Sequence, residues 1–115
     1  MTERLTDEVC DLLQAARDLL AKSGWCRGVN AKSERGKWAS LASPRACKFC
    51  ASGAIQRAGI ERGASEETIS EACQQLGIQA SFQSIAVGLV DFNDTVARSK
   101  QDVLRLFDAV LDKKR

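Results

Sequence analysis

The cysteines are the residues whose type and spacing could support chemistry in this chain. Cys47 and Cys50 lie three residues apart in the stretch SPRACKFCASGA, with Arg45 and Lys48 close to them in sequence. The thiolate is both the nucleophile and the metal ligand, and neighbouring cations favour it over the thiol. The stretch is therefore consistent with a metal site, with a redox pair, or with two small side chains packed on one face of a helix.

The metal and redox interpretations each lack a feature that such a site needs. Zinc held by Cys26, Cys47 and Cys50 needs a fourth ligand from Cys10, Cys73 or a carboxylate, since the chain has no histidine. A redox pair of the C-x-x-C type is expected beside a βαβ pattern, and none precedes this one. Free cysteine commonly packs as a small hydrophobe, and Cys10, Cys50 and Cys73 lie in or beside apolar stripes. We favour packing, predict no cofactor, and keep zinc as the alternative.

The absence of histidine among the 115 residues removes the commonest catalytic machinery. It excludes Ser-His-Asp and Cys-His nucleophiles, histidine general bases, and zinc sites that need imidazole. We therefore predict that the protein is not an enzyme but an accessory or interaction protein.

The N-terminal residues MTERLTDEVC are charged from the third residue onward and contain no apolar core of a signal peptide. The longest mainly apolar run, SIAVGLV, is too short to span a bilayer. Five cysteines, an odd number, fit reduced thiols better than a disulfide framework. We expect a cytoplasmic location and no membrane partner.

The net charge of +2 is unevenly distributed along the chain. Residues 27–62 contain eight basic and two acidic side chains, which could face an anionic partner or pair with acidic helices of the same fold. The sequence pI of about 8.3 lies below the value of about 9 that flags nucleic-acid-binding domains. We predict a protein partner, and weak nucleic-acid binding through this segment is the alternative. The candidate binding residues are Arg27, Lys32, Arg35, Lys37, Trp38, Asn93 and Asp94.

Asn93 and Asp94 follow an apolar run and precede the last predicted helix. Such a pair could bind a cation or a polar ligand. Asn and Asp are also turn and capping residues, because their short side chains bond to nearby backbone groups. Capping needs only the local spacing found here, so we favour the structural role.

Four segments have the period of amphipathic helices. They are residues 3–22, a segment from the N-cap Ser43 to a stop at Gly59, one from Ser65 to an ending at Gly77, and one that opens with a capping box of Ser99 and Asp102. Residues 81–94 are ambiguous between strand and helix.

Residues 25–42 lose the helical period and predict a short hairpin or ordered loop that turns at Arg35–Gly36. Trp25 and Trp38 are expected to pin this segment to the core. Gly53, inside a predicted helix and beside small residues, predicts that another element crosses very close. We therefore predict a single, mainly α domain over residues 1–115. It is a compact bundle of about five helices with a short β-hairpin or ordered loop between the first and second long helices.

Three short motifs occur in order: Trp25-Cys26-Arg27-Gly28, Cys50-Ala51-Ser52-Gly53-Ala54, and Ile85-Ala86 followed by Asn93-Asp94. With these motifs the sequence resembles a small family of uncharacterised bacterial and phage proteins, a domain of unknown function. The resemblance implies a compact, mostly helical domain in which SIAVGLVDFND is helical, and it implies no activity. The chain departs from the family pattern at Phe92, where tryptophan is common, and at Thr95-Val96-Ala97, which replaces a turn containing proline and glycine.

Overall fold

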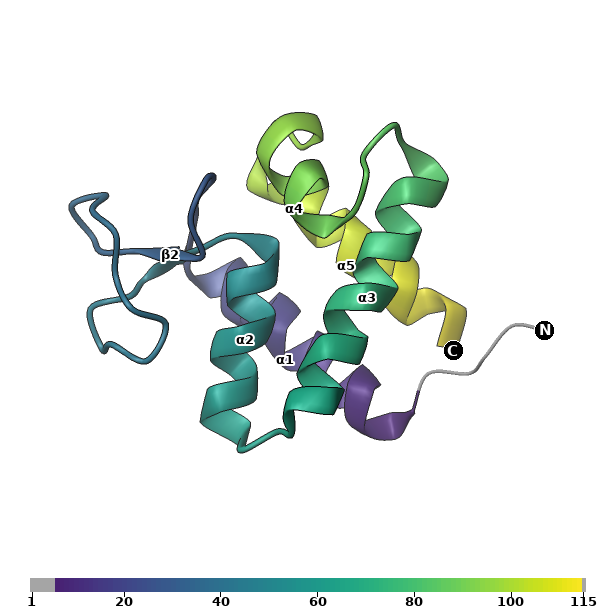
Figure 1. The fold of residues 1–115 in the computed structure, drawn as a ribbon, viewed down its shortest axis with the longest axis horizontal. Coiled ribbons are helices and arrows are strands. Elements are labelled where there is room, and N and C mark those ends of the chain that lie inside the picture. Colours follow the sequence, from purple (N-terminus) through teal and green to yellow (C-terminus); the bar gives the residue numbers. More distant parts are fainter. Residues whose placement is uncertain (1–5, 115) are drawn as a thin grey trace.

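Helices make up most of the chain between residues 6 and 114, which are the residues described by the structure, a computed structural model (Figure 1). The elements are α1 (Asp7–Lys22), β1 (Gly24–Trp25), β2 (Ala31–Lys32), β3 (Lys48–Phe49), α2 (Ala51–Arg62), α3 (Glu66–Gln83), α4 (Leu89–Asp91), a π-helical turn η1 (Phe92–Val96) and α5 (Lys100–Lys114). The prediction of a mainly α fold with about five helices is confirmed.

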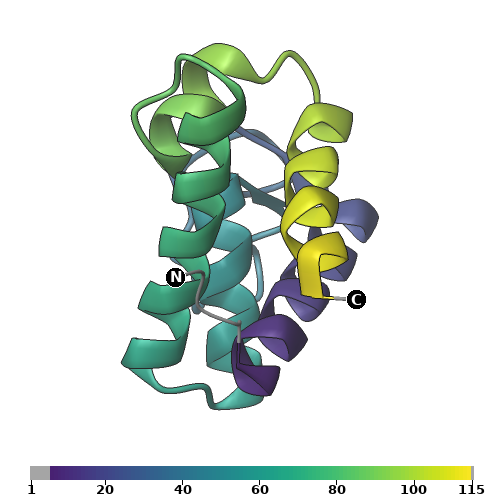
Figure 2. The same ribbon diagram turned by 90° about the vertical axis from the view of Figure 1, so that its right-hand side faces the viewer.

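Helix α1 is the central element of the bundle and packs against α2, α3 and α5 (Figure 2). Its buried residues are Val9, Leu12, Leu13, Ala16 and Leu20, which belong to the predicted apolar stripe. Its N-terminus is capped by the hydroxyl oxygen of Thr6, which accepts a hydrogen bond from the Val9 N–H at 3.2 Å. The helix was predicted to span residues 3–22, and it ends as expected at Lys22. Residues 3–5 lie outside the described part of the chain.

Two polar contacts fix α5 against α1. The Arg17 guanidinium donates two hydrogen bonds to the Asp108 carboxylate, at 2.7 and 3.2 Å. The Lys100 ammonium donates to the carbonyls of Ala21 and Ser23, which places a cation at the negative end of α1. The predicted start of α5 is close to the observed one, where the Asp102 carboxylate accepts from the Arg98 N–H at 2.9 Å.

The predicted boundaries of α2 are wrong at both ends. The helix begins after Cys50 rather than at Ser43, because Lys48 and Phe49 are taken into the sheet as β3. Ser43 instead accepts from the Arg45 N–H in a turn. The helix passes through Gly59, where the lack of a side chain admits Ile69 of α3. It ends at Arg62 and is followed by Gly63 in the left-handed conformation, with φ of 67°.

Helix α3 starts at the predicted cap, where the Ser65 hydroxyl accepts from the Thr68 N–H at 3.1 Å. The predicted ending at Gly77 is wrong, since the helix continues to Gln83. Gly77 lies where α4 packs on α3, and a β-carbon there would be 3.4 Å from the Leu89 nitrogen. The ambiguous residues 81–94 form the last turn of α3, a loop, α4 and most of η1, so the helical expectation holds outside the loop.

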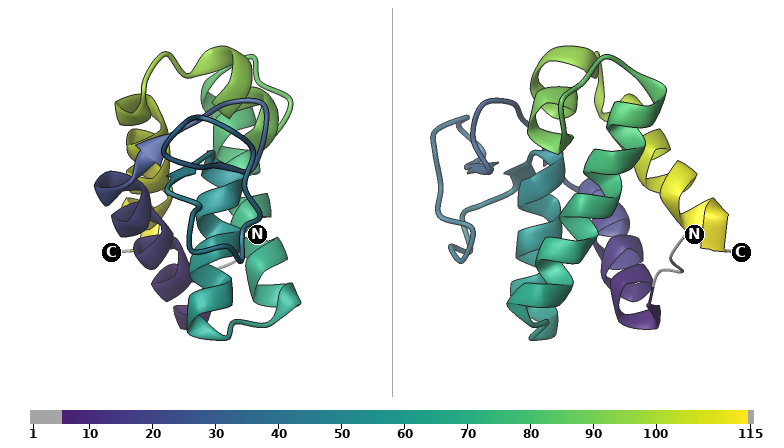
Figure 3. Two further views of the ribbon diagram at one scale, coloured as in Figure 1. Left: turned by 90° about the vertical axis from the view of Figure 1, so that its left-hand side faces the viewer. Right: turned by 45° about the vertical axis from the view of Figure 1, so that its right-hand side comes forward.

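The sheet has three short strands in the order β1-β3-β2, with β1 parallel and β2 antiparallel to β3. The hairpin prediction is right in part, because the chain after β2 turns back and Lys32 pairs with Trp38. The central strand, however, comes from outside residues 25–42. Ala31 and Phe49 are buried on the inner face, and the sheet and its loops cover the start of α2 (Figure 3). Trp38 does not pin the segment to the core: 70% of it is exposed.

Candidate functional site

The three sequence motifs meet at one buried side chain, Asn93. Its side-chain oxygen accepts hydrogen bonds from the Trp25 indole N–H at 2.8 Å and from the Ala51 backbone N–H at 2.9 Å. Its amide nitrogen donates to the Cys26 carbonyl at 3.1 Å and to the Asp94 carboxylate at 2.8 Å. Only 1% of Asn93 is exposed. Asn93 is therefore a structural link between β1, the start of α2 and η1, and its own polar groups are all engaged.

Asp94 and Cys50 extend this network to the backbone. The Asp94 carboxylate also accepts from the Gly28 N–H at 3.1 Å, which fixes the loop after β1. Cys50 is the N-cap of α2, with its sulfur accepting from the Gly53 N–H at 3.2 Å. The Asn30 carbonyl, which accepts from the Cys50 N–H, lies directly over Gly53. The predicted close approach at Gly53 is confirmed.

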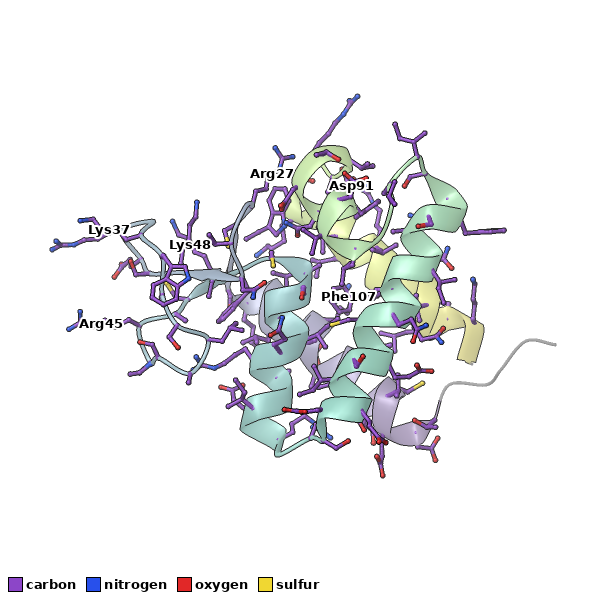
Figure 4. The ribbon with its side chains drawn as sticks, in the orientation of Figure 1. Arg27, Lys37, Arg45, Lys48, Asp91 and Phe107 are labelled. Atoms are coloured by element: carbon purple, nitrogen blue, oxygen red, sulfur yellow. The ribbon has the colours of Figure 1, made fainter. Side chains whose placement is uncertain are left out.

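Four cations line a depression of about 330 Å³ on the sheet end of the molecule. Figure 4 labels two of them, Arg27 and Lys48. Lys32 and Lys48 come from paired strands, and Arg27 and Arg98 come from the loops beside them. The remaining lining residues are Trp25, Cys26 and Gly36, so no carboxylate from residues 6–114 lines this cation pocket. Within residues 6–114, none of the three ion pairs involves one of these cations.

A larger groove of about 980 Å³ lies beside the cation pocket, and the two share no lining residue. It runs between the loop after β2 and the turn before β3, and we call it the hairpin groove. Arg35, Lys37 and Arg45 contribute cations, Glu34 the one carboxylate, and Trp38 an exposed indole. Lys37 and Arg45 extend into solvent on this side of the molecule (Figure 4).

The structure separates Cys47 from the two cysteines with which the metal interpretation grouped it, whereas Cys26 and Cys50 lie near each other. Cys47 does not share a helix face with Cys50: it precedes β3 and lines the hairpin groove, whereas Cys26 lines the cation pocket. Within the described part of the chain, no group of three or more Cys, Asp or Glu side chains is placed to hold a metal ion. The zinc alternative remains a prediction.

Burial raises the pKa of three thiols. Burial together with the nearby Cys50 raises the pKa of Cys26 to about 11. The pKa of Cys50 is also raised, mainly by burial, although backbone N–H groups at the start of α2 act in the opposite direction. Burial is also the main cause that raises the pKa of Cys73. At neutral pH these side chains are thiols, and the Cys26 thiol donates to the Val29 carbonyl at 3.5 Å.

The cysteines should therefore differ in reactivity. At neutral pH we expect a thiol reagent to label half-buried Cys47 before Cys26 and Cys50, each only 6% exposed. Labelling of Cys26 should rise steeply as the pH approaches about 11, because only the thiolate reacts. Peptide mass spectrometry after timed labelling measures the order. If all three thiols were protected until a strong chelator was added, the zinc alternative would be correct instead.

The predicted binding residues fall into three places. Arg27 and Lys32 line the cation pocket, Arg35, Lys37 and Trp38 line the hairpin groove, and Asn93 and Asp94 form the buried network. Sequence reasoning missed Lys48, Arg45 and Arg98 as site residues. The alternation of Lys48 and Phe49 is too short to signal a strand, and Arg98 reaches the pocket only through the tertiary fold.

These features define a small, mainly α domain with a buried polar network and a basic sheet end. No helix between residues 6 and 114 has the length and apolar character needed to cross a membrane. The chain belongs to a family of unknown function (DUF6197), whose sequence profile matches residues 4–113. Comparison with curated proteins gave no match, and comparison with solved structures gave none either.

Proposed function

We propose that the protein is a non-enzymatic interaction protein that binds an acidic partner protein in the hairpin groove. The observation that carries the proposal is the exposure of Trp38, 70%, in a groove of about 980 Å³. A tryptophan has a large apolar area to bury, and leaving it in water forgoes that stabilisation. Trp and Arg are also the residues that most often dominate binding energy at protein interfaces.

The charge of the hairpin groove favours an acidic partner. Three cations and one carboxylate line it, so an approaching acidic surface is attracted and a basic one is repelled. Arg35 and Lys37 lie on the tight turn after β2, in which the Ser33 N–H donates to the Lys37 carbonyl at 2.7 Å. This turn presents the cations and the indole together on a hydrogen-bonded backbone, so little backbone entropy is lost on binding.

A protein partner is favoured over a nucleic acid by the character of the groove. Proteins that bind single strands stack successive bases on several aromatic side chains. Among the described residues, Trp38 is the only aromatic one that lines this groove. The modest sequence pI of about 8.3 supports the same choice.

The proposal is tested by affinity capture from the source cells with three forms of the tagged protein. We expect the wild type and Arg105→Glu, a charge reversal on the exposed face of α5, to retain the same acidic protein. A Trp38→Ala/Arg35→Glu double variant should lose it, with an unchanged melting temperature because both side chains are exposed. Capture that survives the double variant contradicts the proposal, and capture abolished by nuclease favours the nucleic-acid alternative.

A further inference from the structure

The cation pocket carries an arrangement of charge that the fold alone does not explain. Lys32 and Lys48 are directly opposite each other in the β2–β3 ladder, on the outer face of the sheet. Like charges at such a position destabilise a sheet. Arg27 and Arg98 add two more positive charges to the same depression of about 330 Å³.

The carboxylates near this site do not relieve the repulsion. Asp94 is close enough to influence Cys26, but its carboxylate is held by the Gly28 N–H and the Asn93 amide and does not line the pocket. Asp102, close in sequence to Arg98, accepts from the Arg98 backbone N–H and pairs with Arg105. In the part of the chain that the structure describes, the four cations therefore face a volume that no negative side chain lines.

Two of the cations are held in place by their surroundings. The aliphatic stem of Lys48 lies over Gly24, where an added β-carbon would be 2.6 Å from the lysine Cγ. The Arg27 guanidinium stacks over the Trp25 ring at 4.9 Å and donates to the Ala97 carbonyl. Trp25 is in turn fixed by Asn93 through its indole N–H. The buried network thus positions one wall of the pocket before any ligand arrives, which lowers the entropic cost of binding.

From this geometry we infer that the cation pocket binds a phosphate-class dianion, either free or as the terminal phosphoryl group of a small molecule. Arginine presents a planar fork of donors that matches phosphate oxygens, and lysine contributes a compact charge. A dianion compensates two of the four positive charges, including the repulsion across the β2–β3 ladder, whereas one carboxylate compensates one. The inference does not depend on the proposed function, because the hairpin groove and the cation pocket share no lining residue.

Isothermal titration calorimetry of the full chain with pyrophosphate, and separately with inorganic phosphate, tests the inference at ionic strength matched with chloride. We expect saturable binding of at least one probe by the wild type. Lys32→Gln and Lys48→Gln should each weaken this binding about tenfold, because each removes one charge-assisted contact. Lys37→Gln, which removes a cation from the hairpin groove, is the matched control and should bind as the wild type does.

A second measurement separates lost binding from lost folding. Without ligand, Lys48→Gln should melt at or above the wild-type temperature, because it removes the repulsion across the ladder. No heat with either probe overturns the inference, as does equal weakening by Lys37→Gln. Binding of a single-stranded oligonucleotide without binding of pyrophosphate or phosphate also overturns it, in favour of a nucleic acid.

Discussion

Replacing Gly53 with alanine is expected to destabilise the fold by about 3 kcal/mol, the upper part of the range for overpacking a close contact. A β-carbon at this position would lie 1.9 Å from the Asn30 carbonyl oxygen, far inside any van der Waals contact. The obstacle is backbone, and the same carbonyl accepts a hydrogen bond from the Cys50 N–H at 3.2 Å. Relief of the clash therefore requires the loop before β2 to move away from the start of α2. Urea unfolding of both proteins measures the difference.

Gly77→Ala is the matched control, because it is the same change at another helix glycine. A β-carbon there would be 3.4 Å from the nearest non-neighbouring atom, an ordinary contact. We expect this variant to be as stable as the wild type or more stable, by up to about 1 kcal/mol, since alanine is the better helix former. If Gly53→Ala were as stable as Gly77→Ala, the close approach at Gly53 would not exist in solution.

The helices were predictable wherever an apolar stripe faces the core over several turns. Helix α1 is the clearest case, since its stripe and its end at Lys22 depend only on neighbouring residues. The start of α2 was not predictable in the same way. Ser43 and Pro44 have good local features for a helix start, but pairing of Lys48 and Phe49 with two strands from residues 24–32 competes with that helix. Strand pairing is non-local, and two-residue strands leave no period in the sequence.

The candidate site shows the same division between local and non-local causes. Basic residues 27–37 mark the sheet end in the sequence, so Arg27, Lys32 and Arg35 were predictable as candidate binding cations. The convergence of Lys32, Lys48 and Arg98 follows from strand register and the path of η1 into α5, which no local pattern encodes. Asn93 was expected to act locally as a turn or capping residue, yet its partners Trp25, Cys26 and Ala51 lie 68, 67 and 42 residues away.

Replacing Asn93 with alanine is the second change with a large expected effect, a loss of about 3 kcal/mol in the free energy of unfolding. The substitution leaves the Trp25 indole N–H, the Ala51 N–H and the Cys26 carbonyl without their partner at a position that is 1% exposed. A buried polar group without a partner costs about 1–3 kcal/mol, so loss of several bonds at once exceeds the effect of an ordinary cavity. Denaturant unfolding followed by circular dichroism measures the loss.

Asn93→Asp removes the side-chain N–H donor of residue 93 and keeps its acceptor oxygen. It therefore separates the effect of losing the donor from the effect of losing the whole network. The carboxyl oxygen can still accept from Trp25 and Ala51, but an ionised carboxylate cannot donate to the Cys26 carbonyl and would lie beside the Asp94 carboxylate. Burial and the neighbouring charge should raise the pKa of this group in the folded state above its unfolded value of about 3.9. Destabilisation relative to the wild type should therefore be smallest in acid and grow as pH rises through the folded-state pKa.

A pH-independent difference between Asn93→Asp and the wild type would contradict a buried position for residue 93. The same variants also connect the network to the cation pocket, because Asn93 fixes Trp25 and Trp25 supports the Arg27 guanidinium. Under conditions where Asn93→Ala remains folded, its pyrophosphate affinity should fall, because this variant removes the acceptor for the Trp25 indole although residue 93 does not line the pocket. Unchanged affinity in the folded variant would mean that the cations of the sheet end hold their positions without the network beneath them.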